Sequence, residues 1–177
     1  FRADRQPEFT QIDMEMSFVD EEDIRQIVEG LVNNVMNEVL NENLKLPFPI
    51  ISYDEAMNRY GTDKPDIRFD LSLIDFSIYS KGSNLETLQT ADEVKAIIVP
   101  KGESFSRKII DELTAFVKEF SSQEKKIPIS GLGWMKYSNN DFAGGISKFF
   151  DIELKREIIK SLNMNEGDLI LIAGGEK

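Results

Sequence analysis

Residues 2–18 read RADRQPEFTQIDMEMSF, and from Phe9 to Phe18 polar and apolar side chains largely alternate. Successive side chains of a β-strand point to opposite faces, so this alternation predicts a strand of an antiparallel sheet. The apolar underside of that strand would carry Ile12, Met14, Met16 and Phe18. The opposite face would carry Phe9, Gln11, Asp13, Glu15 and Ser17.

The residue types in this stretch suit an anionic, ring-containing ligand. An arginine offers a planar fork of donors to a phosphate or a carboxylate. Phe9 offers a surface on which a flat ring can stack, and Asp13 offers a countercharge to an ammonium group. The alternative is that the polar face is simply the solvated side of an antiparallel sheet.

The segment RADRQPEFTQ (residues 2–11) resembles motif 2 of bacterial-type aspartyl-tRNA synthetases, which are class II aminoacyl-tRNA synthetases. The resemblance extends to YGTDKPDIR (residues 60–68). It also extends to VKAIIVP (residues 94–100) and GLGWMK (residues 131–136), which are similar to the inserted module of that family, often called the GAD domain. Residues 69–94 match less clearly.

The resemblance implies a role for each of five residues. Arg2 would clamp the ATP α-phosphate and the substrate carboxylate, as the catalytic residue. Gln6 would lie on the ATP-binding loop and Phe9 would stack on adenine. Gln11 and Asp13 would line the L-aspartate pocket, with Asp13 near the substrate ammonium.

The assignment of Arg2 has an alternative. The family usually places a short acidic stretch between Phe-Arg and Arg-Ala-Asp-Arg-Gln, whereas here Phe1-Arg2 directly precedes Ala3. Either the acidic stretch is skipped and Arg2 is the clamp, or Arg2 is an ordinary loop arginine. Because no anticodon-binding barrel, motif 1 or motif 3 is found, we expect the chain to be an internal part of a longer enzyme that is inactive on its own.

Composition excludes several classes of function. The chain has 177 residues, no cysteine and no histidine, which removes disulfides, thiolate zinc sites, imidazole metal sites and His-based triads. The formal net charge of −11 disfavours an extended nucleic-acid-binding face. No run of 18 apolar residues is present, so we expect no membrane role and a cytoplasmic location. Carboxylates could still bind Mg²⁺, but we expect no metal site within this chain.

The remaining chain predicts helices and strands from periodicity and capping signals. The predicted helices begin at Asp20, at the capping box Ser52–Glu55, at Ser106 and at Asp151. The predicted strands are 94–99, 131–137 and 168–173. The first helix is expected to cover a sheet, and the paired glycines at 144–145 and 174–175 are expected to be turns.

The polar segment 62–66 is the predicted domain boundary. Its neighbourhood carries Asp63, Lys64, Asp66 and Arg68, which either close over an active site, reach the tRNA acceptor end, or pair with one another. Trp134 either stacks on a base or belongs to the core. The run Glu124-Lys125-Lys126 is expected to be a solvated loop.

Together these observations predict an α+β fold: a piece of the class II antiparallel-sheet core (residues 1–68) and a two-layer α/β, GAD-like insertion domain (residues 69–177). The implied function is aspartate–tRNA ligation, with L-aspartate, ATP and tRNA-Asp as substrates, and tRNA-Asn left open. The implied full-length enzyme is a homodimer that uses Mg²⁺ through ligands outside this chain. The alternative is a non-catalytic tRNA-binding or interaction module of the GAD type; an asparaginyl-type synthetase is disfavoured by the insertion.

Overall fold

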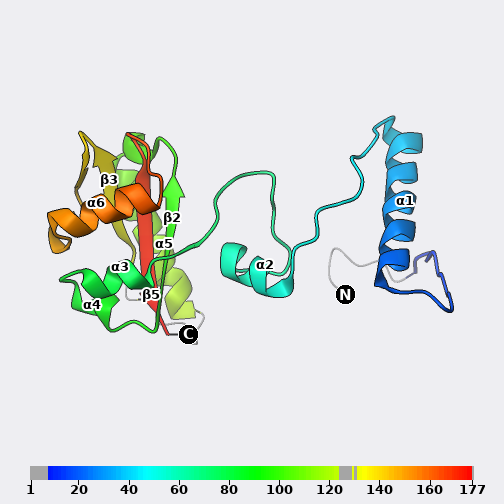
Figure 1. Ribbon diagram of the computed structural model, residues 1–177, viewed down its shortest axis with the longest axis horizontal. Helices are drawn as coiled ribbons and strands as arrows, with labels where there is room; N and C mark the ends of the chain where they lie inside the picture. The colour runs from blue at the N-terminus through cyan, green and yellow to red at the C-terminus, as the bar shows by residue number, and fades with distance from the viewer. Residues whose placement is uncertain (1–7, 124–128, 130, 177) are drawn as a thin grey trace. The chain divides into compact units, whose positions relative to one another are not determined.

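The structure, a computed structural model, describes residues 8–123, 129 and 131–176 (Figure 1). The chain divides into two compact units after Ile50. Residues 51–68, which the sequence assigns to the catalytic core, therefore group with the second unit. The boundary predicted between residues 68 and 69 stays a prediction.

The strand predicted over residues 9–18 is wrong in this structure. Between residues 8 and 20 no residue is in a β-strand, and all of these residues are exposed. Ile12, Met14 and Met16, predicted to be buried, are exposed as well. The physical reason is that a strand is stabilised by backbone hydrogen bonds to a neighbour, and no described strand pairs with this segment.

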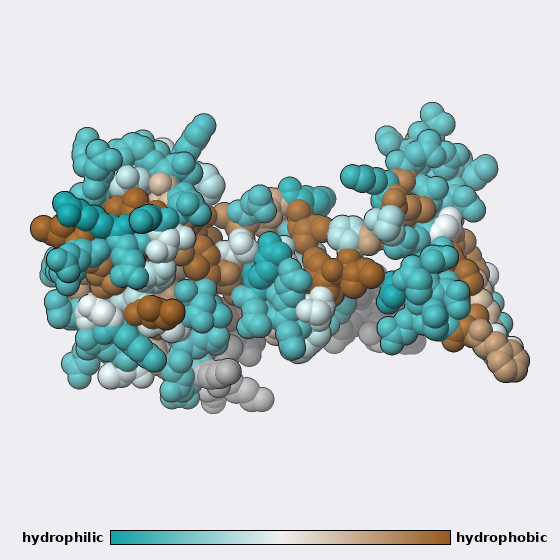
Figure 2. All heavy atoms as spheres, in the orientation of Figure 1, coloured by the Kyte–Doolittle hydropathy of each residue, from teal (hydrophilic) through white to brown (hydrophobic). Residues whose placement is uncertain are grey.

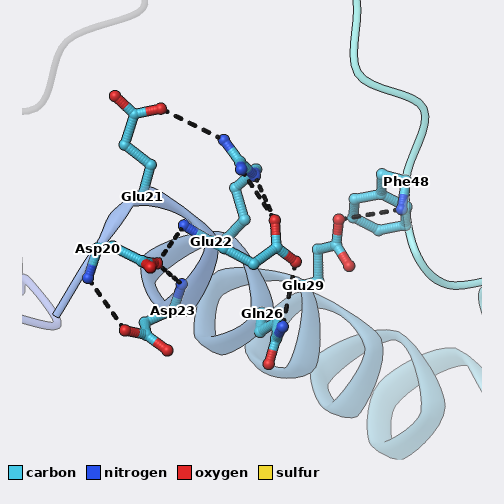
Figure 3. A network of polar contacts seen from close by, with 8 residues as sticks. Asp20, Glu21, Glu22, Asp23, Gln26, Glu29 and Phe48 are labelled. Atoms are coloured by element: carbon cyan, nitrogen blue, oxygen red, sulfur yellow. Dashed lines mark hydrogen bonds and ion pairs between the residues drawn. The ribbon is translucent and has the colours of Figure 1, made fainter.

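The predicted first helix is confirmed as α1 (Glu21–Leu40). Asp20 is its N-cap: its carboxylate accepts hydrogen bonds from the backbone N–H groups of Glu22 and Asp23 (Figure 3). Asp23 completes a capping box by accepting from the N–H of Asp20 at 3.0 Å. Asn41, in the left-handed conformation at φ 54°, ends the helix.

A line of polar side chains on α1 holds the segment that follows the helix. The side-chain oxygen of Asn33 accepts from the N–H of Leu44 at 2.8 Å. One turn earlier, the Glu29 carboxylate accepts from the N–H of Phe48 at 3.0 Å (Figure 3). Because Leu44 binds nearer the end of α1 and Phe48 nearer its start, the chain runs back along the helix.

The predicted short helix is confirmed as α2 (Tyr53–Tyr60). Its N-cap Ser52 accepts from the N–H of Glu55 at 3.2 Å, and Gly61, at φ 69°, is its C-cap. Glu55 does not return a hydrogen bond to Ser52 as a full capping box would; it binds Arg59 at 2.8 Å instead. The N–H of Leu73 donates to the carbonyl of Arg59, which ties α2 to the chain beyond the polar turn.

The second unit contains a five-stranded sheet, in which every pairing is antiparallel (Figure 1). The spatial order is β1-β2-β5-β3-β4. Its strands are β1 (Ile74–Asp75), β2 (Glu93–Val99), β3 (Gly133–Ser138), β4 (Asp141–Ala143) and β5 (Leu169–Gly175). The α+β fold is thus confirmed, and three strands lie where the sequence predicted them. The edge strands β1 and β4 were not predicted.

Helices lie on both sides of this sheet. Those in front in Figure 1 are α3 (Ser77–Gly82), α4 (Glu86–Gln89) and α6 (Ile152–Ser161). Behind the sheet lies α5 (Arg107–Gln123). Two single-turn 3₁₀ helices are η1 (Gly102–Ser104) and η2 (Ser147–Phe149). The module therefore has three layers instead of the predicted two.

The main core lies between the sheet and the front helices. Alternate residues of the three central strands point into it, as the two-residue period requires. Its buried members are Phe76, Leu88, Val94, Ala96, Met135, Tyr137, Phe142, Phe150, Ile158, Met164, Ile170 and Ile172. This core lies within the second unit and joins its sheet to α3, α4 and α6.

Candidate functional site

The predicted ligand-binding residues are not assembled into a pocket in this structure. Phe9 is 73% exposed, and Gln11 and Asp13 are exposed as well. None of these three makes a hydrogen bond or ion pair with another described residue. Arg2 and Gln6 lie outside the described residues. The five assignments therefore stay predictions.

The first unit presents an unusual amount of apolar surface. No residue of α1 is buried, and Phe18 is fully exposed. The exposed apolar side chains of α1 are Ile24, Ile27, Val28, Val32, Val35, Val39 and Leu40. Figure 2 shows hydrophobic atoms at the surface of this unit. An apolar helix face of this size is typical of a helix that packs against another element.

The four charged residues around Pro65 pair with one another. Lys64 Nζ lies 3.8 Å from Asp63. Arg68 binds Asp66 through its guanidinium, with Nε 2.8 Å from Oδ1. The hydrogen bond from the Arg68 side chain lowers the pKa of the Asp66 carboxyl. Mutual pairing, one of the three alternatives, is therefore present; the other two stay predictions.

The Gly144-Gly145 pair forms the predicted turn. Both glycines have positive φ, 77° and 48°. They lie directly against Trp134, so close that a Cβ on Gly145 would be 1.9 Å from the Trp134 carbonyl oxygen. Trp134 is half-buried, which fits a packing role. The second predicted turn, 174–175, instead lies at the end of β5.

Among the hollows that the described residues of the second unit form, two were missed by sequence reasoning. One, of about 290 Å³, is lined by Thr87, Thr90, Ala91, Asp92, Gly174, Gly175 and Glu176. The other, of about 250 Å³, lies between the β3–β4 turn and α6. Its lining residues are Asn140, Asp141, Ile152, Lys155, Arg156 and Ile159. The only sequence signal for the second hollow is the adjacent pair Lys155-Arg156.

Two further observations concern the described residues alone. No group of three or more carboxylates among them is placed to hold a metal ion. None of the described helices is long and apolar enough to cross a membrane.

Comparison with known proteins identifies the class. A family model described as "tRNA synthetases class II (D, K and N)" matches residues 1–168. The chain belongs to this family of class II aminoacyl-tRNA synthetases.

Within this family, the chain is similar to proteins that are named as aspartate–tRNA ligases. The chain is 43% identical to the "Aspartate--tRNA(Asp/Asn) ligase" of Nitratidesulfovibrio vulgaris, over 99% of this chain and 28% of that protein. It is 45% identical to the protein of the same name from Natranaerobius thermophilus, over 99% of this chain and 29% of that protein. It is 43% identical to the "Aspartate--tRNA ligase" of Streptococcus pyogenes serotype M5, over 96% of this chain and 28% of that protein. The chain thus spans less than a third of the length of these relatives.

Proposed function

We propose that this chain is part of an aspartate–tRNA ligase, which activates L-aspartate with ATP and transfers it to tRNA-Asp. The observation that carries the proposal is the 43–45% identity to relatives named as aspartate–tRNA ligases, over 96–99% of the chain. The motif RQPEF (residues 5–9) supports it, because a pure accessory domain has no need of this segment. ATP, L-aspartate and the tRNA are substrates of the proposed reaction.

The proposed reaction has two steps. The aspartate carboxylate attacks the ATP α-phosphorus, which releases pyrophosphate and leaves aspartyl-adenylate; the aminoacyl group then moves to the tRNA. Such a displacement depends on positioning and charge neutralisation more than on a general base. A chain without histidine suits this chemistry.

The residues assigned by resemblance fit these two needs. In the proposal, Arg2 neutralises the α-phosphate and orients the aspartate carboxylate. Gln6 and Phe9 hold the nucleotide, while Gln11 and Asp13 hold the amino acid, with Asp13 facing its ammonium. Mg²⁺ would assist through ligands elsewhere in the enzyme.

The exposed surface of the first unit supports this assignment. In the proposal, residues 9–18 become a strand when neighbouring strands of the catalytic sheet are present, and the apolar face of α1 packs on that sheet. This would bury Ile12, Met14 and Met16 on one side and leave Phe9, Gln11 and Asp13 facing the substrates. The proposed enzyme is a homodimer, as the resemblance implies.

Residues 69–177 are proposed to be the GAD-like insertion domain. Their support is the resemblance of residues 94–100 and 131–136 to that module, together with the core that the sheet and its helices share. One relative is named for tRNA(Asp/Asn), and another is named an aspartate–tRNA ligase without the tRNA being specified. Both tRNA-Asp and tRNA-Asn are therefore candidate substrates.

The test is ATP–pyrophosphate exchange by the full-length protein, with L-aspartate, L-asparagine and L-lysine compared. We expect exchange with L-aspartate alone and none by the 177-residue chain in isolation. Gln6→Ala should lower the exchange rate. Gln26→Ala is the matched control, because Gln26 lies on α1 and, among the described residues, binds only Glu22, at 3.1 Å.

The outcomes separate the candidate functions. Exchange that does not depend on L-aspartate would overturn the proposal. Binding of tRNA without any exchange would favour the non-catalytic module instead. Charging of tRNA-Asp and tRNA-Asn transcripts, measured side by side, would then show which tRNAs are substrates.

A further inference from the structure

The hollow between the β3–β4 turn and α6 combines apolar walls with cationic side chains, as many ligand sites do. It measures about 250 Å³, and one side of it is the exposed face of α6. Ile152 and Ile159 supply apolar walls, and Ile152 is 65% exposed. Isolated apolar exposure is ordinary, but here two isoleucines flank two cationic side chains around one concave surface.

Arg156 is the unusual member of this group. The other arginines that the structure describes, Arg25, Arg59, Arg68 and Arg107, each bind a carboxylate. No described residue forms a hydrogen bond or ion pair with Arg156, which lines the hollow. In a chain with 32 acidic and 21 basic residues, a guanidinium that remains unpaired is available for an anion from outside.

The absence of a pair does not follow from a lack of neighbouring carboxylates. Glu153 precedes Arg156 by three positions on α6, a spacing at which helical side chains can pair. The two nevertheless form no ion pair in the structure. Arg156 is exposed and lines the hollow instead.

Lys155, beside it, is held in place by the protein. Its Nζ lies 3.3 Å from Asp141 and donates to the carbonyl oxygen of Phe142 at 3.3 Å. The Lys155 side chain is only 12% exposed. Asp141 therefore compensates Lys155, and the uncompensated positive charge of the hollow belongs to Arg156.

The turn that forms the other wall is also fixed. The N–H groups of Asn139 and Asn140 both donate to the Glu166 carboxylate. This leaves the Asn140 side-chain amide, which has no partner among the described residues, at the edge of the hollow. An amide supplies both a donor and an acceptor, as the polar edge of a nucleobase requires.

We propose that this hollow binds a nucleoside monophosphate unit. Arg156 would hold the phosphate through its fork of donors, the two isoleucines would contact the ribose or base, and Asn140 would bind a polar edge. The unit can come from a free nucleotide or from the end of an RNA strand. None of the residues proposed for aspartate activation takes part, so this proposal does not rest on the proposed function.

The experiment follows the isoleucine methyl signals of the 177-residue chain by NMR. The probes are AMP, inorganic phosphate and a single-stranded RNA hexamer that bears a terminal phosphate. We expect saturable shifts at Ile152 and Ile159 with AMP or the RNA, and none at Ile170 and Ile172, which are fully buried in the core. Phosphate alone should bind more weakly because it cannot contact the isoleucines.

Two variants test the role of the guanidinium. Arg156→Gln should weaken binding by about tenfold, the usual effect of losing a charge-assisted hydrogen bond. Lys160→Gln is the matched control: it makes the same charge change on the same helix, but Lys160 does not line the hollow. Its affinity should be unchanged.

Each outcome of these experiments either supports or overturns the proposed site. Saturable binding of AMP but not RNA identifies a free nucleotide as the source, and the reverse identifies RNA. No saturable shift with any probe would overturn the site. Equal weakening by both variants would also overturn it, since non-specific attraction would then explain the binding. Unchanged core methyl signals in both variants would show that the fold is intact.

Discussion

Gly145→Ala should destabilise the second unit strongly, for a reason that is visible in the backbone. Gly145 has φ +48°, and its Cβ position is 1.9 Å from the carbonyl oxygen of Trp134. That carbonyl also accepts the N–H of Ile146 at 3.1 Å. A methyl group therefore collides with an atom that cannot move without breaking the hydrogen bond that closes the turn.

The magnitude follows from two costs. Placing a non-glycine residue in the left-handed region costs about 1–2 kcal/mol. Losing the hydrogen bond from Ile146 to Trp134 adds about 0.5–1.5 kcal/mol. Together they lower the free energy of unfolding by about 1.5–3.5 kcal/mol, a large part of the roughly 5–15 kcal/mol that is usual for a domain.

Urea denaturation followed by tryptophan fluorescence measures this effect directly. Trp134 is the only tryptophan of the chain and contacts the mutated turn, so the signal reports on this unit alone. With a denaturant slope of about 1–3 kcal/mol per molar urea, the midpoint should fall by about 1 M.

The control is Gly82→Ala in the same unit. Gly82 ends α3, and its Cβ position meets only the flexible tip of Leu154, at 3.3 Å. Its effect should stay within about 1 kcal/mol, because helix propensity offsets the close contact. A midpoint for Gly145→Ala equal to that of the wild type, or a fall of the same size for Gly82→Ala, would refute the reasoning.

Three further predictions concern the first unit, the predicted boundary and the charged turn. Phe9→Ala in the full-length protein should raise KM for ATP in pyrophosphate exchange by about tenfold, because stacking on a base contributes about 1–3 kcal/mol; an unchanged KM would remove Phe9 from the site. Limited proteolysis should cut within residues 62–69 and leave a folded piece of roughly a hundred residues, whereas a first cut near residue 50 would favour the division seen in the structure. Arg68→Gln should raise the pKa of Asp66, followed by carbon NMR of its carboxyl, since the Arg68 side chain lowers it. The lowered pKa means that the Asp66–Arg68 contact is lost as pH falls through the titration of Asp66, and a pKa that does not move in the variant would show that the contact does not form in solution.

Four helices, α1, α2, α5 and α6, could be predicted because their signals are local, whereas the short helices α3 and α4 were not predicted. Asp20 and Asp23 cap α1 through hydrogen bonds within four residues, and Ser52 and Gly61 bracket α2 in the same way. Such signals are complete within the sequence window itself. The strands β2, β3 and β5 were predictable from their runs of β-branched, aromatic and other apolar residues.

The features that the sequence did not predict correctly have a common cause, which is that they depend on contacts between residues far apart in the chain. The alternation of residues 9–18 is a good strand pattern, yet without a neighbouring strand it leaves Phe9 and Asp13 in an unpaired segment. The edge strands β1 and β4 have two and three residues, too few for any periodicity to be seen. The hollow beside Arg156 was missed for the same reason: Asn140 and Arg156 come from different elements, which only the fold brings together.

The position of β5 has a consequence for how the second unit folds during synthesis. Residues 169–175 lie at the centre of the sheet, where they pair with β2 on one side and with β3 on the other. Before β5 exists, β2 can pair only with β1 and β3 only with β4, and the paired residues of β2 and β5 lie 70 to 82 positions apart in the sequence. During synthesis the sheet therefore lacks its central strand until residue 175 has left the ribosome. Completion of the sheet is then expected to be a late and cooperative event, as is typical of folds dominated by non-local strand pairing.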